Sequence, residues 1–130
     1  MKILISDAFD PSLPAKLEVF GEVTEDKARL AEVDVVLVRS KTKCTRDYID
    51  QATNLRLIIR GGVGLDNIDV EYARSRGIQV FNTAEASAVA VAELAFALMI
   101  AVPSRLADGH VSMTKRQWLK KELKRTELMG

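Results

Sequence analysis

Five short strand-like segments, four of them mainly apolar, alternate with segments of helical spacing in the first 82 residues, and this alternation constrains the fold more than any other feature. The four apolar segments are residues 2–6, 34–39, 57–60 and 78–81, and the fifth is the short segment 22–24. Between them, residues 13–20, 26–33, 45–52 and 70–75 space their apolar side chains as helices do. The run at 34–39 (DVVLVR) is apolar at successive positions, which is typical of a parallel strand buried on both faces.

Strands that alternate with helices form a parallel sheet with helices on both faces. Right-handed crossovers leave few topologies, and a flavodoxin-like five-stranded sheet is the simplest of them. We therefore predict an α/β domain of this type over residues 1–102, followed by a helical extension over residues 103–130. In the extension, Met113, Trp118 and Leu119 are the expected apolar anchors.

Residues 86–102 form an almost continuous apolar segment whose only charge is Glu93. A helix on the surface of one domain has a polar stripe, so this pattern predicts a long crossover helix that is covered on both sides. We expect residues 88–102 to mediate a homodimer, and Pro103 to kink or end the helix. The apolar run 88–102 is shorter than the roughly 20 residues of a membrane-spanning helix, so no membrane association is predicted.

Bulk composition excludes several classes of partner and compartment. A net charge of +1 gives no sign of a nucleic-acid partner, and we interpret the basic residues of 103–130 as a solvated helix face. The single cysteine, Cys44, cannot form an internal disulfide and is consistent with a reducing compartment. No secretory signal pattern follows Met1, so a cytoplasmic protein is expected. Cys44 has no neighbouring histidine in the sequence and is interpreted as a bystander thiol.

Polar and glycine residues gather where the predicted strands end, which is where open parallel sheets bind ligands. The strand at 34–39 ends at Arg39, Ser40 and Lys41, and the strand at 57–60 runs into Gly61-Gly62-Val63-Gly64. Glycines let backbone N–H groups approach an anion closely, and an arginine can donate two parallel hydrogen bonds to a carboxylate or phosphate. Together these residues predict a pocket for a small anionic molecule.

Each of these features also has a purely structural interpretation. The glycines can form a tight turn and nothing more, and Arg39 can be a solvated loop charge; the combination at one sheet edge is what favours a binding site. Asp7, Glu93 and the single histidine, His110, are interpreted as structural.

Several other classes of protein conflict with particular residues. A phosphate-receiver domain needs an acidic residue where Arg39 stands, and a flavin-binding flavodoxin needs a phosphate loop where residues 7–11 read DAFDP. The glycines at 61–64 do not fit the dinucleotide fingerprint G-x-G-x-x-G. The sequence has no Walker motif, zinc-ligand pattern or serine triad.

Four stretches resemble the D-2-hydroxyacid dehydrogenases, and most of all the phosphoglycerate dehydrogenase branch of that family. They are residues 38–43 (VRSKTK), 60–69 (RGGVGLDNID), 76–83 (RGIQVFNT) and 91–94 (VAEL). The resemblance covers nearly the whole chain in matching order. It implies the substrate-binding domain of a two-domain enzyme whose second domain, a Rossmann domain, binds NAD.

The resemblance also implies roles for individual residues. Backbone groups at Ser40 and around Gly62–Gly64 would hold the substrate carboxylate. Arg39 and Lys41 would contact the phosphate of a phosphorylated substrate, and Val63 would lie against the nicotinamide side of the cofactor. The long helix that carries Glu93 would cross toward the second domain and contribute to dimerisation.

The sequence departs from the family pattern in two ways. Residues 83–87 read TAEAS where the family usually has Pro and Asn, and Pro103 stands where Ala is more usual. In the family the catalytic Arg, Glu and His follow the NAD-binding glycine motif, which does not occur in these 130 residues. We therefore expect a fragment without catalytic activity of its own. The alternative is a free-standing flavodoxin-like binding or structural module, truncated or engineered.

Overall fold

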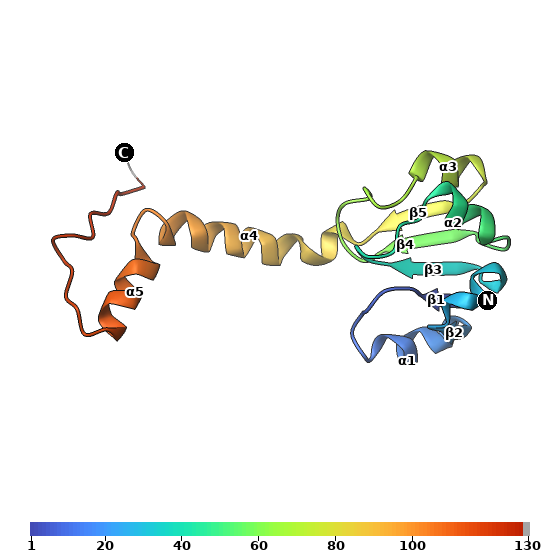
Figure 1. Ribbon diagram of the computed structural model, residues 1–130, viewed down its shortest axis with the longest axis horizontal. Coiled ribbons are helices and arrows are strands. Elements are labelled where there is room, and N and C mark those ends of the chain that lie inside the picture. The colour runs from blue at the N-terminus through green and yellow to red at the C-terminus, as the bar shows by residue number, and fades with distance from the viewer. Residues whose placement is uncertain (129–130) are drawn as a thin grey trace. The chain divides into compact units, whose positions relative to one another are not determined.

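The computed structural model describes residues 1–128, which divide into two compact units, residues 1–87 and the part of the chain from Ala88 onward. The first unit is built on one sheet of five strands (Figure 1). The strands are β1 (Lys2–Ile5), β2 (Glu22–Thr24), β3 (Val35–Val38), β4 (Leu57–Arg60) and β5 (Gln79–Asn82). All pairings are parallel and the strand order is β2-β1-β3-β4-β5, which confirms the predicted α/β sheet.

Short helices connect the strands of the first unit. They are α1 (Leu13–Leu17), which continues as the 3-10 helix η1 (Glu18–Phe20), then the 3-10 helix η2 (Lys27–Glu32), α2 (Arg46–Gln51) and α3 (Val70–Ser75). The caps follow from the sequence: the side chains of Thr45 and Asp69 accept hydrogen bonds from the third residue after them, at the starts of α2 and α3. Gly77, with φ +77°, ends α3 in the left-handed conformation that glycine adopts without strain.

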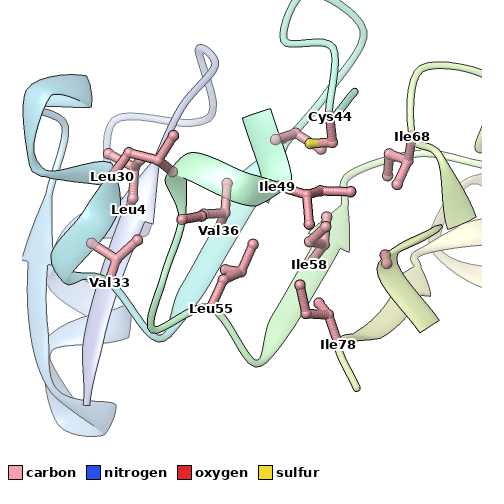
Figure 2. Packing of buried hydrophobic residues seen from close by; sticks show 13 residues of the cluster. Leu4, Leu30, Val33, Val36, Cys44, Ile49, Leu55, Ile58, Ile68 and Ile78 are labelled. Carbon is pink, nitrogen blue, oxygen red and sulfur yellow. The ribbon is translucent and has the colours of Figure 1, made fainter. Parts of the chain in front are cut away.

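Helices cover both faces of the sheet, as predicted. On one face, Leu4, Val36 and Ile58 of the strands pack with Ile49 of α2 and Ala73 of α3 (Figure 2). On the other face, the strand residues Ile3, Val35 and Leu37 pack against Leu13 and Leu17 of α1. Residues that alternate along β1 and β3 therefore enter opposite cores, which explains why β3 is apolar at every position.

The second unit begins within α4 (Ala84–Ala101), close to the predicted helix at 86–102. None of the α4 residues is buried against the described chain. Its 18 residues have a mean hydropathy of 1.8, so this helix is long and apolar enough to cross a membrane. The sequence argument against a membrane span counted only residues 88–102, and the observed helix is longer, so that argument no longer holds. A helix that packs against protein can have the same length and hydropathy.

The C-terminal extension is less helical than predicted. Helix α5 (Leu106–Thr114) is present, but residues 115–128 form turns and irregular chain. Arg116 has φ +55°, a left-handed conformation that cannot continue an α-helix. Met113 and Trp118 are 55% and 75% exposed, so the prediction that they anchor the extension is wrong for the described chain. The predicted boundary at residue 102, between a substrate-binding domain and a helical extension, stays a prediction.

We predict that Ile58→Ala lowers the free energy of unfolding by about 2–5 kcal/mol, because it leaves a cavity in the centre of the sheet. Ile58 is 0% exposed, whereas Val19, on η1, is 80% exposed. Val19→Ala is therefore the matched control and should change stability by less than about 0.5 kcal/mol. Urea unfolding followed by circular dichroism measures both values, and equal losses would contradict the assigned core.

Candidate functional site

The turn that follows β3 is held by the carboxylate of Asp7, at the end of β1. The Arg39 amide donates to Oδ2 of Asp7 at 2.6 Å, and the hydroxyl of Thr42 donates to Oδ1 at 2.7 Å. The Thr42 amide also donates to this carboxylate, 3.2 Å from each oxygen. Burial acts to raise the pKa of Asp7, but these hydrogen bonds outweigh it and hold the pKa below its ordinary value. Asp7 is thus structural, as the sequence suggested, and stays charged.

Asn67 holds the same turn from the side of the β4–α3 loop. Its Nδ2 donates to the carbonyl of Arg39 at 2.8 Å and to that of Thr42 at 2.7 Å. The Cys44 amide donates to the Asn67 carbonyl at 2.8 Å, and Cys44 pairs with Ile68 in a parallel bridge. The loops after β1, β3 and β4 are therefore tied together at one edge of the sheet.

The side chain of Arg39 is guided toward the face of the sheet that α1 covers. Its Nη1 donates to the carbonyl of Ala8 at 3.1 Å, and its guanidinium lies 5.9 Å from the ring centroid of Phe9. A Cβ at Gly61 would lie 2.6 Å from Cε1 of Phe9, so a larger residue there would displace the Phe9 ring. Arg39 is exposed, and its other guanidinium N–H groups remain available to an anion.

The glycine turn after β4 has a conformation that side chains disfavour. Gly62 has φ +146°, and a Cβ there would lie 2.3 Å from Nη1 of Arg60. The Gly62 amide donates to the Thr83 hydroxyl at 2.9 Å, and Nδ2 of Asn82 donates to the Val63 carbonyl at 2.6 Å. Residues at the end of β5 therefore hold the turn in place.

Several backbone amides at this edge remain open, and three of them lie on the predicted site residues. Within the described chain, the N–H groups of Ser40, Val63 and Gly64 donate to no protein acceptor, and all three residues are exposed. The Gly62 amide, by contrast, is already used by Thr83. Fixed, unpaired amides beside an arginine form an arrangement that can hold a carboxylate or a phosphate.

The structure places the predicted residues as follows. Arg39, Ser40 and Lys41 follow β3, and Gly62, Val63 and Gly64 follow β4, so all six lie at the carboxyl edge of neighbouring strands. Lys41 lines a cavity between the loops after β1 and β3. Sequence reasoning gave no role to Asn67, Asn82 or Thr83, which support the site. The only available signal was their position directly after, or soon after, an apolar strand.

Cys44 is fully buried, and burial together with the charge of Asp7 raises its pKa to about 12. The nucleophilic thiolate is therefore scarce at neutral pH, in keeping with a bystander thiol. Among residues 1–128, no group of three or more His, Cys, Asp or Glu side chains is arranged to hold a metal ion.

The fold is that of a doubly wound α/β domain, with exposed basic side chains and a glycine turn at the carboxyl edge of its sheet. The family model of the D-isomer specific 2-hydroxyacid dehydrogenase, catalytic domain, matches residues 4–123, and the chain belongs to this family.

Two relatives and one solved structure illustrate the similarity. The hydroxypyruvate reductase of Thermotoga maritima is 52% identical over 118 residues, which cover 88% of this chain and 39% of that protein. The D-3-phosphoglycerate dehydrogenase of Methanocaldococcus jannaschii is 40% identical over 138 aligned residues, covering 100% and 26%. The D-lactate dehydrogenase of Aquifex aeolicus, solved with NAD and lactic acid, shares the fold with a TM-score of 0.81 at 22% identity, covering 96% and 41%. The chain thus spans less than half the length of these proteins.

We predict that Asp7→Asn lowers the free energy of unfolding by about 1–3 kcal/mol at neutral pH, because an amide replaces one acceptor oxygen and the charge. The folded-state pKa of Asp7 lies below the ordinary value of 3.8, so its contribution is complete above that value. The contribution is lost as the pH falls through the lower, folded-state pKa.

Urea unfolding of the two proteins at pH 7 and at successively lower pH measures this difference. The gap between them should be constant down to about pH 5 and should shrink in stronger acid. Glu71→Gln is the control, because it removes an exposed carboxylate of α3 that forms no ion pair within the described chain. An Asp7→Asn effect no larger than that of Glu71→Gln would contradict the role of Asp7.

Proposed function

We propose that this chain is the substrate-binding part of an NAD-dependent D-2-hydroxyacid dehydrogenase, and that its carboxyl sheet edge binds the hydroxy or oxo acid. The observation that carries the proposal is the set of open amides at Ser40, Val63 and Gly64, fixed beside the free donors of Arg39. A carboxylate is the group that such amides and an arginine fork hold together.

Each residue has a distinct role in this proposal. The amides of Ser40, Val63 and Gly64 bind the substrate carboxylate, and the backbone of Gly62 shapes the turn that presents two of them. Arg39 and Lys41 bind the phosphate of a phosphorylated substrate as cations. In this proposal, the residues of this chain bind the negatively charged groups of the substrate. None of them is assigned a proton-transfer role.

The substrate we favour is 3-phosphoglycerate, which would place the parent enzyme in serine biosynthesis. The basic pair Arg39 and Lys41 supports a phosphorylated acid. Hydroxypyruvate, named in the relative that is 52% identical, is the second candidate and lacks the phosphate. The two differ in one testable respect: only the phosphorylated acid gains from the cationic side chains.

The cofactor fits this chain through one contact. Val63 is 57% exposed at the site, and an exposed apolar side chain there suits the face of a nicotinamide ring. When bound, NAD supplies the hydride acceptor. The G-x-G-x-x-G motif that would bind its pyrophosphate does not occur in residues 1–130, so we expect no tight cofactor binding and no sustained turnover from these residues alone.

We also propose that α4 pairs with α4 of a second copy to form a homodimer, and that the protein is cytoplasmic. In this proposal α4 neither spans a membrane nor contacts nucleic acid. Its large apolar side chains are exposed: Val89, Val91, Leu94, Phe96, Leu98, Met99 and Ile100. Exposed apolar area of this size is normally covered by a partner, and two-fold pairing is the commonest way to cover it. Glu85 and Glu93 interrupt the apolar surface, which disfavours burial in lipid.

Titration of ¹⁵N-labelled chain with 3-phosphoglycerate, followed by NMR, tests the substrate assignment. We expect saturable shifts at the Ser40, Val63 and Gly64 amides, and about tenfold weaker binding in Arg39→Met, which loses a charge-assisted contact. Arg74→Met, on the exposed face of α3, is the matched control and should bind normally.

Hydroxypyruvate serves as the second ligand in the same titration. Tighter binding of hydroxypyruvate than of 3-phosphoglycerate would favour the unphosphorylated substrate. The absence of shifts at the three amides with both acids would leave the free-standing module as the better description. Sustained turnover of 3-phosphoglycerate with NAD by these 130 residues would refute the assignment of catalysis to another part of the parent enzyme.

We predict that the chain self-associates and that Phe96→Glu weakens this by tenfold or more, because it buries a charge in the paired helices. Phe96 is 67% exposed in the single chain. Val19→Glu is the control, since Val19 is equally open but lies on η1. Sedimentation equilibrium measures the mass, and a monomer at high micromolar concentration would sink the dimer proposal.

A further inference from the structure

A polar cavity of about 470 Å³ lies at the carboxyl ends of β1 and β3, outside the open amides described above. The chain leaves these neighbouring strands toward opposite faces of the sheet: α1 packs on one face and α2 on the other. Such a divergence opens a crevice where doubly wound sheets bind ligands. The proposed hydroxy-acid site, by contrast, is centred on the turns after β3 and β4.

Three lysines line this cavity: Lys27 from η2, and Lys41 and Lys43 from the loop after β3. All three are exposed, and none forms an ion pair within the described chain. The one carboxylate in the lining is Asp7, whose oxygens already accept hydrogen bonds from the β3 turn. The cavity therefore has an excess of positive charge that no described side chain neutralises.

Tyr48 of α2 adds an unused hydrogen-bonding group to the same lining. Its hydroxyl is buried and makes no hydrogen bond of ordinary geometry within the described chain, although the Ser6 side chain lies close enough to lower its pKa. Burial raises the pKa of Tyr48 to about 12, so the hydroxyl stays protonated and able to donate at neutral pH.

The cavity is separate from Arg39. Arg39 is absent from its lining, and its guanidinium lies over Phe9, which packs in the core on the α1 face. Tyr48 packs against the core on the α2 face. Phe9, beneath Arg39, and Tyr48 thus belong to opposite faces of the sheet, and the carboxylate of a small acid held at Ser40 and Val63 does not need Lys27 or Lys43.

We propose that Lys27, Lys43 and Tyr48 bind the phosphate group of a small phosphorylated molecule in this cavity, at a second site that borders the hydroxy-acid site at Lys41. Several ammonium groups with no arginine fork suit a compact dianion that has acceptor oxygens on all sides. A free phosphate ion and a phosphate monoester share this chemistry.

Titration of the full ¹⁵N-labelled chain with inorganic phosphate at constant ionic strength tests the proposal. We expect saturable shifts at the amides of Ser6, Thr42, Lys43 and Tyr48. Lys27→Ala and Lys43→Ala should each weaken binding about fivefold, the effect of one exposed ion pair. Lys16→Ala, which removes an exposed lysine of α1 that lies outside the cavity, is the charge-matched control and should bind normally.

Tyr48→Phe removes only the hydroxyl and keeps the packing of the ring, so it should weaken binding without unfolding the chain. Glycerol 2-phosphate serves as the monoester. Equal affinity for both ligands assigns the site to free phosphate, and tighter binding of the ester assigns it to a phosphorylated metabolite; both results support the site. Shifts that do not saturate, or equal losses in Lys16→Ala and Lys27→Ala, overturn it.

Arg39→Met separates this site from the proposed hydroxy-acid site. Phosphate binding that survives this substitution, while binding of hydroxypyruvate is lost, establishes two sites. Phosphate binding that is lost in Arg39→Met, with shifts at Val63 and Gly64, shows a single site and overturns the inference while leaving the proposed function intact. If the unmodified chain binds phosphate but does not bind hydroxypyruvate, the phosphate site is supported and the proposed hydroxy-acid site is contradicted.

Discussion

The carboxylate of Asp7 determines the position of the turn after β3, and both candidate anion sites depend on that turn. It accepts hydrogen bonds from the Arg39 amide, the Thr42 amide and the Thr42 hydroxyl. Asp7 stays charged, and its oxygens are occupied by these hydrogen bonds within the turn. Asn67 restrains the other side of the turn through two carbonyls. The backbone of this turn is thus held in place by the protein itself, which reduces the entropic cost of binding.

The order of the strands explains why two kinds of donor occur so close together. Strand β3 lies between β1 and β4, so the loop that follows it borders both neighbours. Toward β4 it faces a glycine turn whose contribution is backbone amides, and toward β1 it faces a crevice lined by long cationic side chains. Since successive residues of an extended chain point to opposite faces, Arg39 follows Leu37 to the α1 face, and α2, which carries Tyr48, packs on the other.

Much of this arrangement could be predicted from the sequence. The predicted segments located all five strands within a residue or two at each end, and β3 was the clearest because a strand buried on both faces leaves no room for polar side chains. The strand ends then indicated Arg39, Ser40 and the glycine turn. The sequence did not indicate that Asn82 and Thr83 hold that turn, or that Tyr48 lies beside Ser6 and the lysines at the cavity, because these partners come from different strands and helices.

The error in the C-terminal extension has a different physical cause. Met113 and Trp118 are large apolar residues, but an apolar side chain is buried only where a surface exists to pack against. Ser112 is the one buried residue of α5 within the described part of the second unit. No apolar core forms there for the apolar side chains of this helix to pack into. The sequence predicts which face of a helix is apolar, but whether that face is buried depends on what the rest of the fold packs against it.

The burial of Cys44 gives the chain an internal reporter of its own motions. The single thiol belongs to the residue that forms the backbone bridge with Ile68, where the loops after β3 and β4 join. A thiol reagent can reach it only during the intervals when those loops separate, so the rate of its modification counts such openings. The rate of Cys44 modification therefore measures how often the two loops separate, and a ligand that holds these loops together should lower it.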